Sequence, residues 1–463
     1  MNETKRMTHD VETLLGNPKR AIIVMAVPLA ISLFVQNLNN LVDVVWVVGL
    51  GADAMCAVGL IYPLYSTLTG LGTGIGIGAS SAIARRLGRG EKELADRTAA
   101  QTILLIFLVA IIITPIFVLL VRPLLLYSGT DTTLQYGLDF GYPLTACSIV
   151  TLMLGVITGL LRSEGAAKRS MIVLVTCAVL NIIFDPLLIY TAGLGTAGAA
   201  WATILATSIS LIIAFYWYLV KKDLYIDLNL KHLKFSRPLQ KDIMVVGFPQ
   251  SLELSIMAIM NIFMNAYIMN VGGSDAMAVY SSVWKLNYML LIPAQAIAAA
   301  IVPVCAAAYG MKRFDRIGAG YYYSLKITIA VMTVISVAVF LFADQTTMMF
   351  AYSGNMQRLQ PDMVDLLRIC CVYLVFMSWI FISSSLLQSL GKGMLAMTSS
   401  LLRNLLILGI FAYASTFGYI GALWWGLAYG EIIGSIGMGL LSLAVLHSIM
   451  IHKDSVMKDE DHD

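Results

Sequence analysis

Long apolar segments, separated by short polar ones, run along almost the whole chain. Dividing the sequence at its charged residues, glycines and prolines leaves twelve apolar stretches. A helix needs about 20 apolar residues to cross a bilayer, and several stretches are longer, so we expect tilted or kinked helices. The pattern predicts an all-α polytopic membrane protein with twelve transmembrane helices, over residues 21–49, 55–83, 99–121, 136–161, 170–191, 196–220, 243–271, 276–309, 324–350, 364–390, 395–416 and 421–448.

The composition excludes most other protein classes. Apolar residues make up 59% of the 463 positions and charged residues 12%, with a mean hydropathy of +0.82. Soluble domains carry about 25% charged residues, so a soluble enzyme, a secreted disulfide scaffold and a disordered chain are excluded. The six cysteines form no CxxC motif, which indicates neither a disulfide framework nor a zinc site. We expect membrane lipid as a partner, no nucleic acid at a net charge of +3, and no cofactor.

The positive charges predict the orientation in the membrane. Of the 30 Lys and Arg residues, 25 lie in the terminal tails, in the loops after even-numbered helices or, for Lys326, at the edge of such a loop. The loops after odd-numbered helices hold only Arg122 and Arg358. Because positive residues stay on the cytoplasmic side, we expect a multi-pass protein of the cell membrane with both termini in the cytoplasm. The first apolar stretch lacks a small-residue cleavage site and is interpreted as a retained helix.

Matched positions indicate that the chain contains a duplication. Val48–Met55 resembles Val271–Met277, and Leu160–Gly165 resembles Leu386–Gly391. The offset stays between 221 and 226 residues, and it pairs Pro28 with Pro249, Asp43 with Asn265, Asn181 with Asn404, and Gly198 with Gly421. Each unit holds six helices, so both face the same way. Parallel repeats are typical of transporters, with the substrate path between the halves.

The duplication predicts the domain organisation. We expect an N-lobe over residues 1–220 with helices 1–6, a cytoplasmic linker over 221–242, and a C-lobe over 243–463 with helices 7–12 and a short cytoplasmic tail. The linker is charged and carries Pro238. Two lobes in one chain make a monomer sufficient.

Two acids in the first half are the sharpest candidates for a functional site, because ionisable groups inside a membrane are costly. Asp43 and Asp185 each lie about six residues before the outer end of a helix, roughly 9 Å below the rim at 1.5 Å per residue. Thr203 on the next helix reaches the same depth, and Asn181 shares a helix face with Asp185. Pro186 removes a helical hydrogen bond and can free a carbonyl nearby.

The chemistry of this group fits a cation. Gln36, Asn40 and Asp43 follow i, i+4, i+7 spacing and predict one polar stripe on the first helix. Carboxylates with an amide and a hydroxyl make an oxygen-rich site that suits Na⁺, and a desolvated acid pair also suits proton loading near neutral pH. The alternative is that each acid only hydrogen-bonds a neighbouring helix.

The second half carries Glu253, Lys285 and Glu431 inside its predicted helices. Lys285 and Glu431 lie at similar depths, so they are expected either to form a buried ion pair or to take part in substrate binding or coupling. Glu253 lies deeper toward the cytoplasm, and Arg403 is expected to extend to the membrane surface from the inner end of its helix. Since Asn265 and Leu408 stand where the first half has its acids, we expect ion coupling in the first half only.

Several signals of enzymatic chemistry are weak or missing. Five glycines alternate over residues 70–78, but no strand precedes them, so they predict close helix packing rather than a nucleotide fingerprint. The sequence has no GxxxxGK[ST] motif and no cluster of catalytic residues at a membrane face. The protein is therefore expected not to be an enzyme. The 25 methionines suit either gap filling or an adaptable substrate lining.

At these positions the sequence resembles the multidrug and toxic compound extrusion (MATE) family over nearly its whole length. The resemblance rests on Pro28, on Leu41–Asp43 and Val48–Ala54, and on three later segments. These are Leu161-Arg162-Ser163-Glu164-Gly165, Asn181-Ile182-Ile183-Phe184-Asp185-Pro186 and Gly198-Ala199-Ala200-Trp201-Ala202-Thr203. The acid in the first helix and the Asn-to-Asp-Pro stretch in the fifth resemble the DNA-damage-inducible (DinF-like) branch. The chain departs from the NorM-like branch, which carries its acids in the second lobe.

The resemblance implies two six-helix lobes in a V and alternating access. It implies export of organic, often cationic, compounds in exchange for inward Na⁺ or H⁺. It assigns cation coupling to Asp43, Asn181, Asp185 and Thr203, and a conformational role to the proline of the first helix, Pro28.

Other transporters remain as alternatives. A flippase for lipid-linked oligosaccharides or lipids of the same superfamily is the nearest, although such relatives often have more spans and a more cationic cavity. A twelve-helix facilitator of the major superfamily would carry a charged loop motif after helix two, where this chain has Arg85–Gly90. A channel would match the composition but could not accumulate a solute against a gradient.

Overall fold

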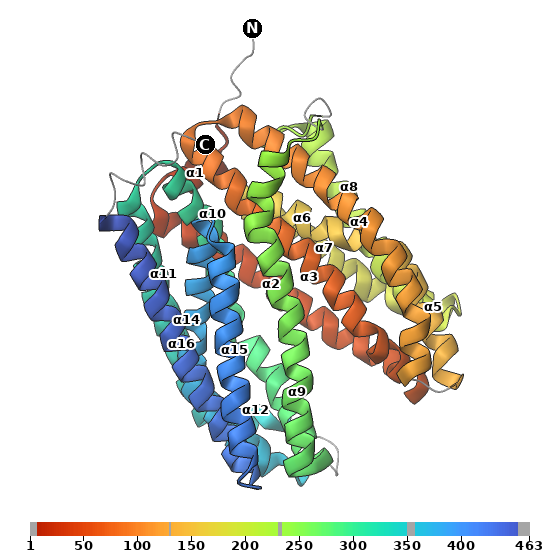
Figure 1. Cartoon of the computed structure of the whole chain (residues 1–463). Coiled ribbons are helices and arrows are strands. Elements are labelled where there is room, and N and C mark those ends of the chain that lie inside the picture. The colour runs from red at the N-terminus through yellow and green to blue at the C-terminus, as the bar shows by residue number, and fades with distance from the viewer. Residues whose placement is uncertain (1–6, 129–130, 230–233, 350–356, 452–463) are drawn as a thin grey trace.

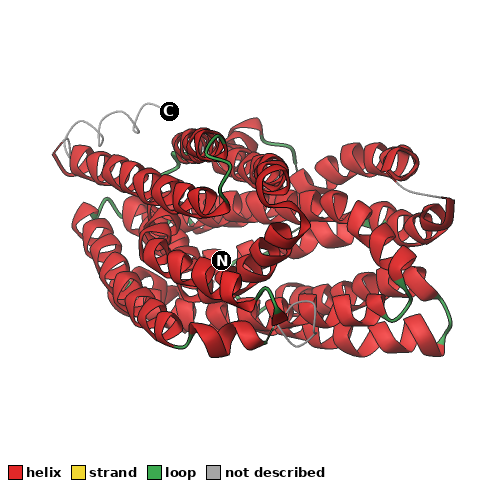
Figure 2. Ribbon diagram, turned by 90° about the horizontal axis from the view of Figure 1, so that it is seen from below, coloured by secondary structure: helices red, strands yellow, loops and turns green. Residues whose placement is uncertain are grey.

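The computed structural model describes residues 7–128, 131–229, 234–349 and 357–451, and every regular element in these residues is a helix. Figure 2 shows these helices joined by short loops. The helices of the first half are α1 His9–Leu15, α2 Pro18–Val48, α3 Ala52–Arg89, α4 Lys92–Ser128, α5 Asp131–Ala146, α6 Ser148–Ser163, α7 Ala167–Pro186 with a π-helix Leu187–Thr191, and α8 Gly195–Phe215 with a π-helix Tyr216–Lys221. Those of the second half are α9 Arg237–Leu290, α10 Ile292–Gly310, α11 Phe314–Leu341, α12 Ala343–Met348, α14 Gln360–Ser389, α15 Gly393–Ser415 and α16 Ile420–Ile451.

The all-α membrane fold is confirmed. Among the described residues, eleven helices are long and apolar enough to cross a membrane, or twelve when the bent pair α5–α6 forms one span. The fourth predicted stretch is divided there by a 51° bend at Cys147. The range α9 holds two helices that meet at a kink at Gly273, whose non-helical φ of 65° is readily adopted only by glycine. The eighth predicted stretch is therefore shared between the part of α9 after this kink and α10. The helix α9 also begins inside the segment expected to be a linker.

The helices form two groups that converge at one end of the molecule (Figure 1). The red to yellow helices of the first half run toward the lower right of the view, and α11, α15 and α16 run down to the bottom centre. The groups meet in the upper part of the view, where α1 also lies. The arrangement is the V that the sequence resemblance implies.

The alternating glycines of α3 let three helices approach closely, which confirms their predicted packing role. A Cβ at Gly72 or Gly76 would clash with the backbone of α6 at Leu152 and Gly155. A Cβ at Gly78 would clash instead with the backbone of α9. Since residues four apart share a helix face, one set of glycines serves packing within the first half and the other serves packing between halves.

Charged groups tie the halves together near the end where they converge. Arg85 and Arg86 of α3 donate to Asp242 of α9 at 2.5 and 2.7 Å.

Glu164, in the turn between α6 and α7, holds the connection that follows the first half. It accepts hydrogen bonds from the Tyr218 hydroxyl at 3.0 Å and from the backbone amides of Tyr225 and Ile226.

Candidate functional site

A cluster of acids and amides joins α2 to α7 in the first half. Asn39 donates through Nδ2 to Oδ2 of Asp43 at 3.0 Å and to Oδ1 of Asn181 at 2.9 Å. Asn181 in turn donates to Oδ1 of Asp185 at 3.3 Å. The two carboxyl groups also lie within hydrogen-bonding reach of each other. The four side chains therefore close a ring, which we call the acid–amide ring.

The acid–amide ring has unused acceptor capacity. Asp43 Oδ1 and Asn39 Oδ1 are buried, and neither has a hydrogen-bond partner among the described residues. Asn181 and Asp185 are 4% and 2% exposed, so water has little access to them. Two carboxylates in contact repel each other when both are ionised. The arrangement is therefore suited to bind a cation among its oxygens or to share a proton.

The local sequence explains how the ring forms. In both helices an asparagine stands four residues before the aspartate, so each pair lies on one helix face. Pro186 follows Asp185 directly, and the α-helix gives way to the π-helix Leu187–Thr191 at that point. No group of three or more His, Cys, Asp and Glu side chains gathers in the described part of the chain, so the ring's candidate ligands are carboxylate and amide oxygens.

The structure brings together three of the four residues expected at this site. Thr203 donates its hydroxyl to the Ala199 carbonyl of its own helix at 3.1 Å, and no described hydrogen bond joins it to the acids. Gln36 is half-buried and Asn40 is exposed, so the expected polar stripe does not reach Asp43 through Asn40. Pro28 is buried within α2, and its carbonyl accepts from Ser32 at 2.9 Å.

Sequence reasoning missed Asn39, which connects the two helices. The signal was present in the shared spacing, because Asn39 precedes Asp43 by the same four residues as Asn181 precedes Asp185. The choice of Asn40 came from extending an i, i+4, i+7 stripe. A helix advances 100° per residue, so neighbouring residues face different sides.

In the second half, two expectations about charges are wrong. Glu431 pairs with Arg403 at 2.8 Å rather than with Lys285, and both partners are 6% exposed at their side chains. Arg403 is buried instead of extending to the surface, and its guanidinium also donates to Asn404 at 2.8 Å. Lys285 is exposed, and no described residue forms a salt bridge with it. Arg403 lies closer to Glu431 than helix depth alone indicated because α15 and α16 pack side by side.

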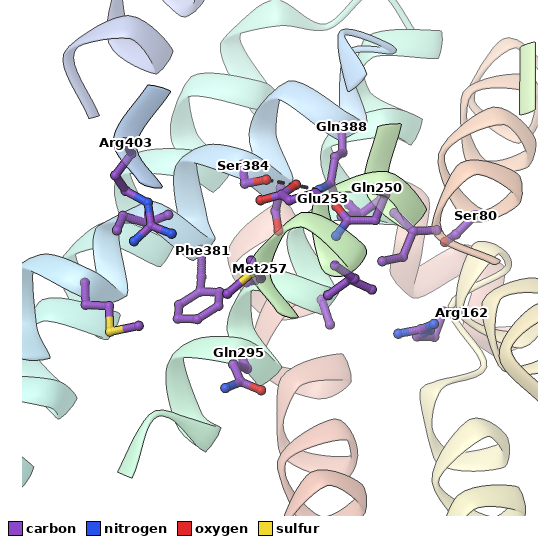
Figure 3. A pocket seen from close by; sticks show the side chains of 18 residues that line it. Ser80, Arg162, Gln250, Glu253, Met257, Gln295, Phe381, Ser384, Gln388 and Arg403 are labelled. Carbon is purple, nitrogen blue, oxygen red and sulfur yellow. Dashed lines mark hydrogen bonds between the residues drawn. The ribbon is translucent and has the colours of Figure 1, made fainter. Parts of the chain in front are cut away.

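A cavity of about 220 Å³ lies where the two halves meet. Figure 3 shows Glu253, Gln250 and Gln388 on one wall, with Arg403 and Arg162 on opposite sides. Glu253 interacts electrostatically with Arg403. Sequence reasoning placed Glu253 inside a helix without a role and did not single out Arg162 as a cavity residue.

Comparisons with known proteins agree with this architecture. The family model described as MatE matches residues 28–187 and 249–414, one match in each half. The chain is 22% identical over 452 residues to the multidrug export protein MepA of Staphylococcus haemolyticus, covering 95% of this chain and 97% of that protein. It is 24% identical over 358 residues to an FAD transporter of Shewanella oneidensis, covering 74% of this chain and 76% of that protein.

A solved structure extends the likeness to three dimensions. A crystal structure of a MATE protein in complex with MaL6 superposes with a TM-score of 0.92 at 32% identity, covering 96% of this chain and 99% of that one. The family match therefore spans both halves of the sequence, and the structural match spans nearly the whole fold. This chain is a multi-pass membrane protein that belongs to the multidrug and toxic compound extrusion (MATE) family.

Proposed function

We propose that the protein is a secondary active antiporter that exports organic, often cationic, compounds in exchange for inward Na⁺ or H⁺. The observation that carries the proposal is the acid–amide ring, with two carboxyl groups in contact inside a membrane-spanning half. The Oδ1 atoms of Asp43 and Asn39 have no partner, which supports these oxygens as ligands for the coupling ion.

The acid–amide ring couples ion binding to the conformation of the protein, because it joins two helices. The helix α2 packs against α7 in its own half and against α10 in the other half. An ion that binds the ring draws α2 and α7 together, and substrate binding favours the opposite arrangement. Each ligand shifts the equilibrium only by its different affinity for the two states. The proline of α2, Pro28, supplies a position without a backbone donor where α2 can bend.

The substrate class follows from the relatives. One curated relative is called a multidrug export protein, which supports export of chemically varied organic compounds.

The proposed orientation sets the conformation. With both termini in the cytoplasm, the V opens to the outside, so this conformation is outward-facing. A single chain suffices for alternating access, because it holds both halves. The Asn-to-Asp-Pro stretch of α7 supports placing the protein in the DinF-like branch.

The test is uptake of a fluorescent organic cation into proteoliposomes under an imposed gradient. A Na⁺ gradient and a pH gradient are applied separately, with Asp185→Asn as the matched variant. We expect one gradient to drive accumulation and the variant to lose it while remaining folded in detergent. Accumulation by Asp185→Asn equal to that of the unmodified protein would remove the ring from the mechanism.

The flippase for lipid-linked sugars predicts a different result. It would move a labelled lipid-linked oligosaccharide between leaflets and would not accumulate the cation under either gradient. That pair of outcomes would replace the antiporter by the flippase.

A further inference from the structure

We infer that the cavity between the two halves binds the acidic group, a carboxylate or a phosphate ester, of an amphipathic organic molecule through Arg162. The inference concerns a second site, separate from the acid–amide ring. It rests on the proposed function only in naming a class of molecule that the transporter carries.

Arg162 is a cation without an anion. It stands in the last turn of α6, and its Nε donates to the Thr158 carbonyl one turn earlier at 3.2 Å. No acidic side chain among the described residues forms a salt bridge with it. Arg162 is half-buried and lines the cavity. A charge beside a cavity between membrane helices is stabilised by an opposite charge, so an anionic partner is expected from outside the chain.

The three arginines that the fold buries most are each paired with an acid. Arg403 is paired with Glu431, and Arg85 and Arg86 are both paired with Asp242. Arg162 alone among these has only a backbone carbonyl as partner. Its two Nη groups have no hydrogen-bond partner among the described residues. A planar guanidinium with both Nη groups free matches the two oxygens of a carboxylate or phosphate.

The remaining walls fit an apolar body that carries one acidic group. Met257, Ile380 and Phe381 provide apolar surface, and Gln295 offers an amide (Figure 3). At the far side Glu253 lies beside Arg403, whose charge Glu431 already balances. Glu253 is the acidic side chain of the cavity lining, so a second acidic group is disfavoured at that side. The charge pattern favours a molecule whose single acidic group points toward α6.

The test compares two probes that differ only in charge. A fluorescent fatty-acid analogue and its methyl ester are titrated into the purified full-length protein in neutral detergent, and binding is followed by fluorescence anisotropy. We expect the acid to bind the unmodified protein more tightly than the ester does. In Arg162→Gln the acid should bind about tenfold or more weakly and the ester about equally. Arg97→Gln, which removes an exposed arginine paired with Glu93, is the matched control and should change neither probe.

Several outcomes would overturn the inference. Equal binding of acid and ester by the unmodified protein would do so, as would unchanged acid binding in Arg162→Gln. If Arg162→Gln does not fold, Arg162→Lys keeps the charge without the bidentate fork and should bind the acid with intermediate affinity. Full acid affinity in folded Arg162→Lys, together with equal ester affinity, would contradict recognition by the guanidinium fork.

The source of the acidic group is settled by competition. Displacement of the acidic probe by phosphatidylglycerol but not by phosphatidylcholine assigns the site to a lipid headgroup. Displacement by a soluble organic acid but not by phosphatidylglycerol assigns it to a solute. Since no gradient is present, the result is independent of antiport. Loss of acid binding with antiport intact would remove only this inference, and intact binding without antiport would remove only the proposed function.

Discussion

The two halves of the chain carry different chemistry at positions that the internal repeat matches. Asp43 of α2 stands where α9 has Asn265, and Asp185 of α7 stands where α15 has Leu408. The first half therefore encloses two acids whose nearest partners are amides. The second half encloses an acid that is already neutralised, since Glu431 is paired with Arg403.

The difference separates a charge that the fold compensates from a charge left for a ligand. A buried ion pair satisfies both partners within the protein, and breaking it is strongly destabilising. Two carboxyl groups in contact instead need a proton or a metal cation from solution to relieve the repulsion between their charges. We therefore expect substitutions in the acid–amide ring to act on transport and substitutions at the ion pair to act on stability.

The largest expected effect is on transport by a first-half variant. Asp43→Asn should abolish gradient-driven accumulation, because the amide cannot accept the coupling proton or supply a negative charge to Na⁺. Asn265→Ala changes the matched position of the second half and should retain most of the transport rate. Both are measured as initial uptake rates in proteoliposomes. Equal loss in the two variants would contradict the asymmetry between the halves.

The next effect is on stability in the second half. Glu431→Gln removes the salt-bridge partner of the buried Arg403 and leaves Asn404 as its hydrogen-bond partner, so it should lower the free energy of unfolding by about 3–5 kcal/mol. The measurement is thermal or denaturant unfolding in detergent. Asp185→Asn removes a comparably buried acid that has no cation partner and should change stability much less.

A double variant separates the cost of an unpaired charge from the value of the pair. Arg403→Met with Glu431→Leu removes both charges and should be close to neutral, because apolar residues of similar volume often replace a buried ion pair without loss. If the double variant is as unstable as Glu431→Gln alone, the pair itself and not the unpaired arginine carries the stability.

A third contrast concerns the turn after α6, which lies outside the membrane spans. Burial raises the pKa of the Glu164 carboxyl from 4.5 to about 7, although hydrogen bonds from Ile226, Tyr218 and Tyr225 oppose the rise. The matched residue of the second half is Leu390. The folded protein thus keeps a proton that the unfolded chain releases, so the free energy of unfolding falls as the pH rises from about 4.5 to about 7.

The size and test of this pH dependence follow from the shift. A change on the order of 3 kcal/mol is expected at full burial, since each pKa unit corresponds to about 1.4 kcal/mol. Melting temperatures are measured between pH 5 and pH 7.5 for the unmodified protein and for Glu164→Gln. The variant should show a flatter profile, whereas Glu93→Gln at an exposed position should not. A profile that stays equally steep in Glu164→Gln would assign the pH dependence to other groups.

Most of the fold could be predicted from the sequence, because long apolar stretches identify membrane-spanning helices. The glycines over residues 70–78 were predictable as packing positions for the same reason, since close helix approach needs small residues. The break at Gly273 falls in the boundary that the sequence predicted between residues 271 and 276. The bend at Cys147 was not predictable, because residues 136–161 form one continuous apolar stretch.

The site was partly predictable, and the errors share one cause. Depth along a helix placed Asp43 and Asp185 at one level, and the structure brings them into contact. Depth does not specify which way a side chain faces, so Thr203 was expected at the ring and Lys285 at Glu431. Rotation about the helix axis and the choice of neighbouring helix are set by tertiary packing, which the sequence pattern alone does not give.

The prediction with the smallest expected effect tests whether ion binding by amides is specific to the first half. Asn39 bridges Asp43 and Asn181, and its counterpart in the repeat is Asn261 of α9. Asn39→Ala removes two hydrogen bonds and one candidate ligand oxygen while leaving both carboxyl groups, so the affinity for the coupling ion should fall by about tenfold, or about 1.4 kcal/mol. The measurement is the ion concentration that gives half-maximal transport. Asn261→Ala and the neighbouring Asn40→Ala should leave it unchanged, because neither residue belongs to the ring. A loss of affinity in Asn261→Ala as large as that in Asn39→Ala would mean that both halves bind the ion and that the acids alone do not define the coupling site.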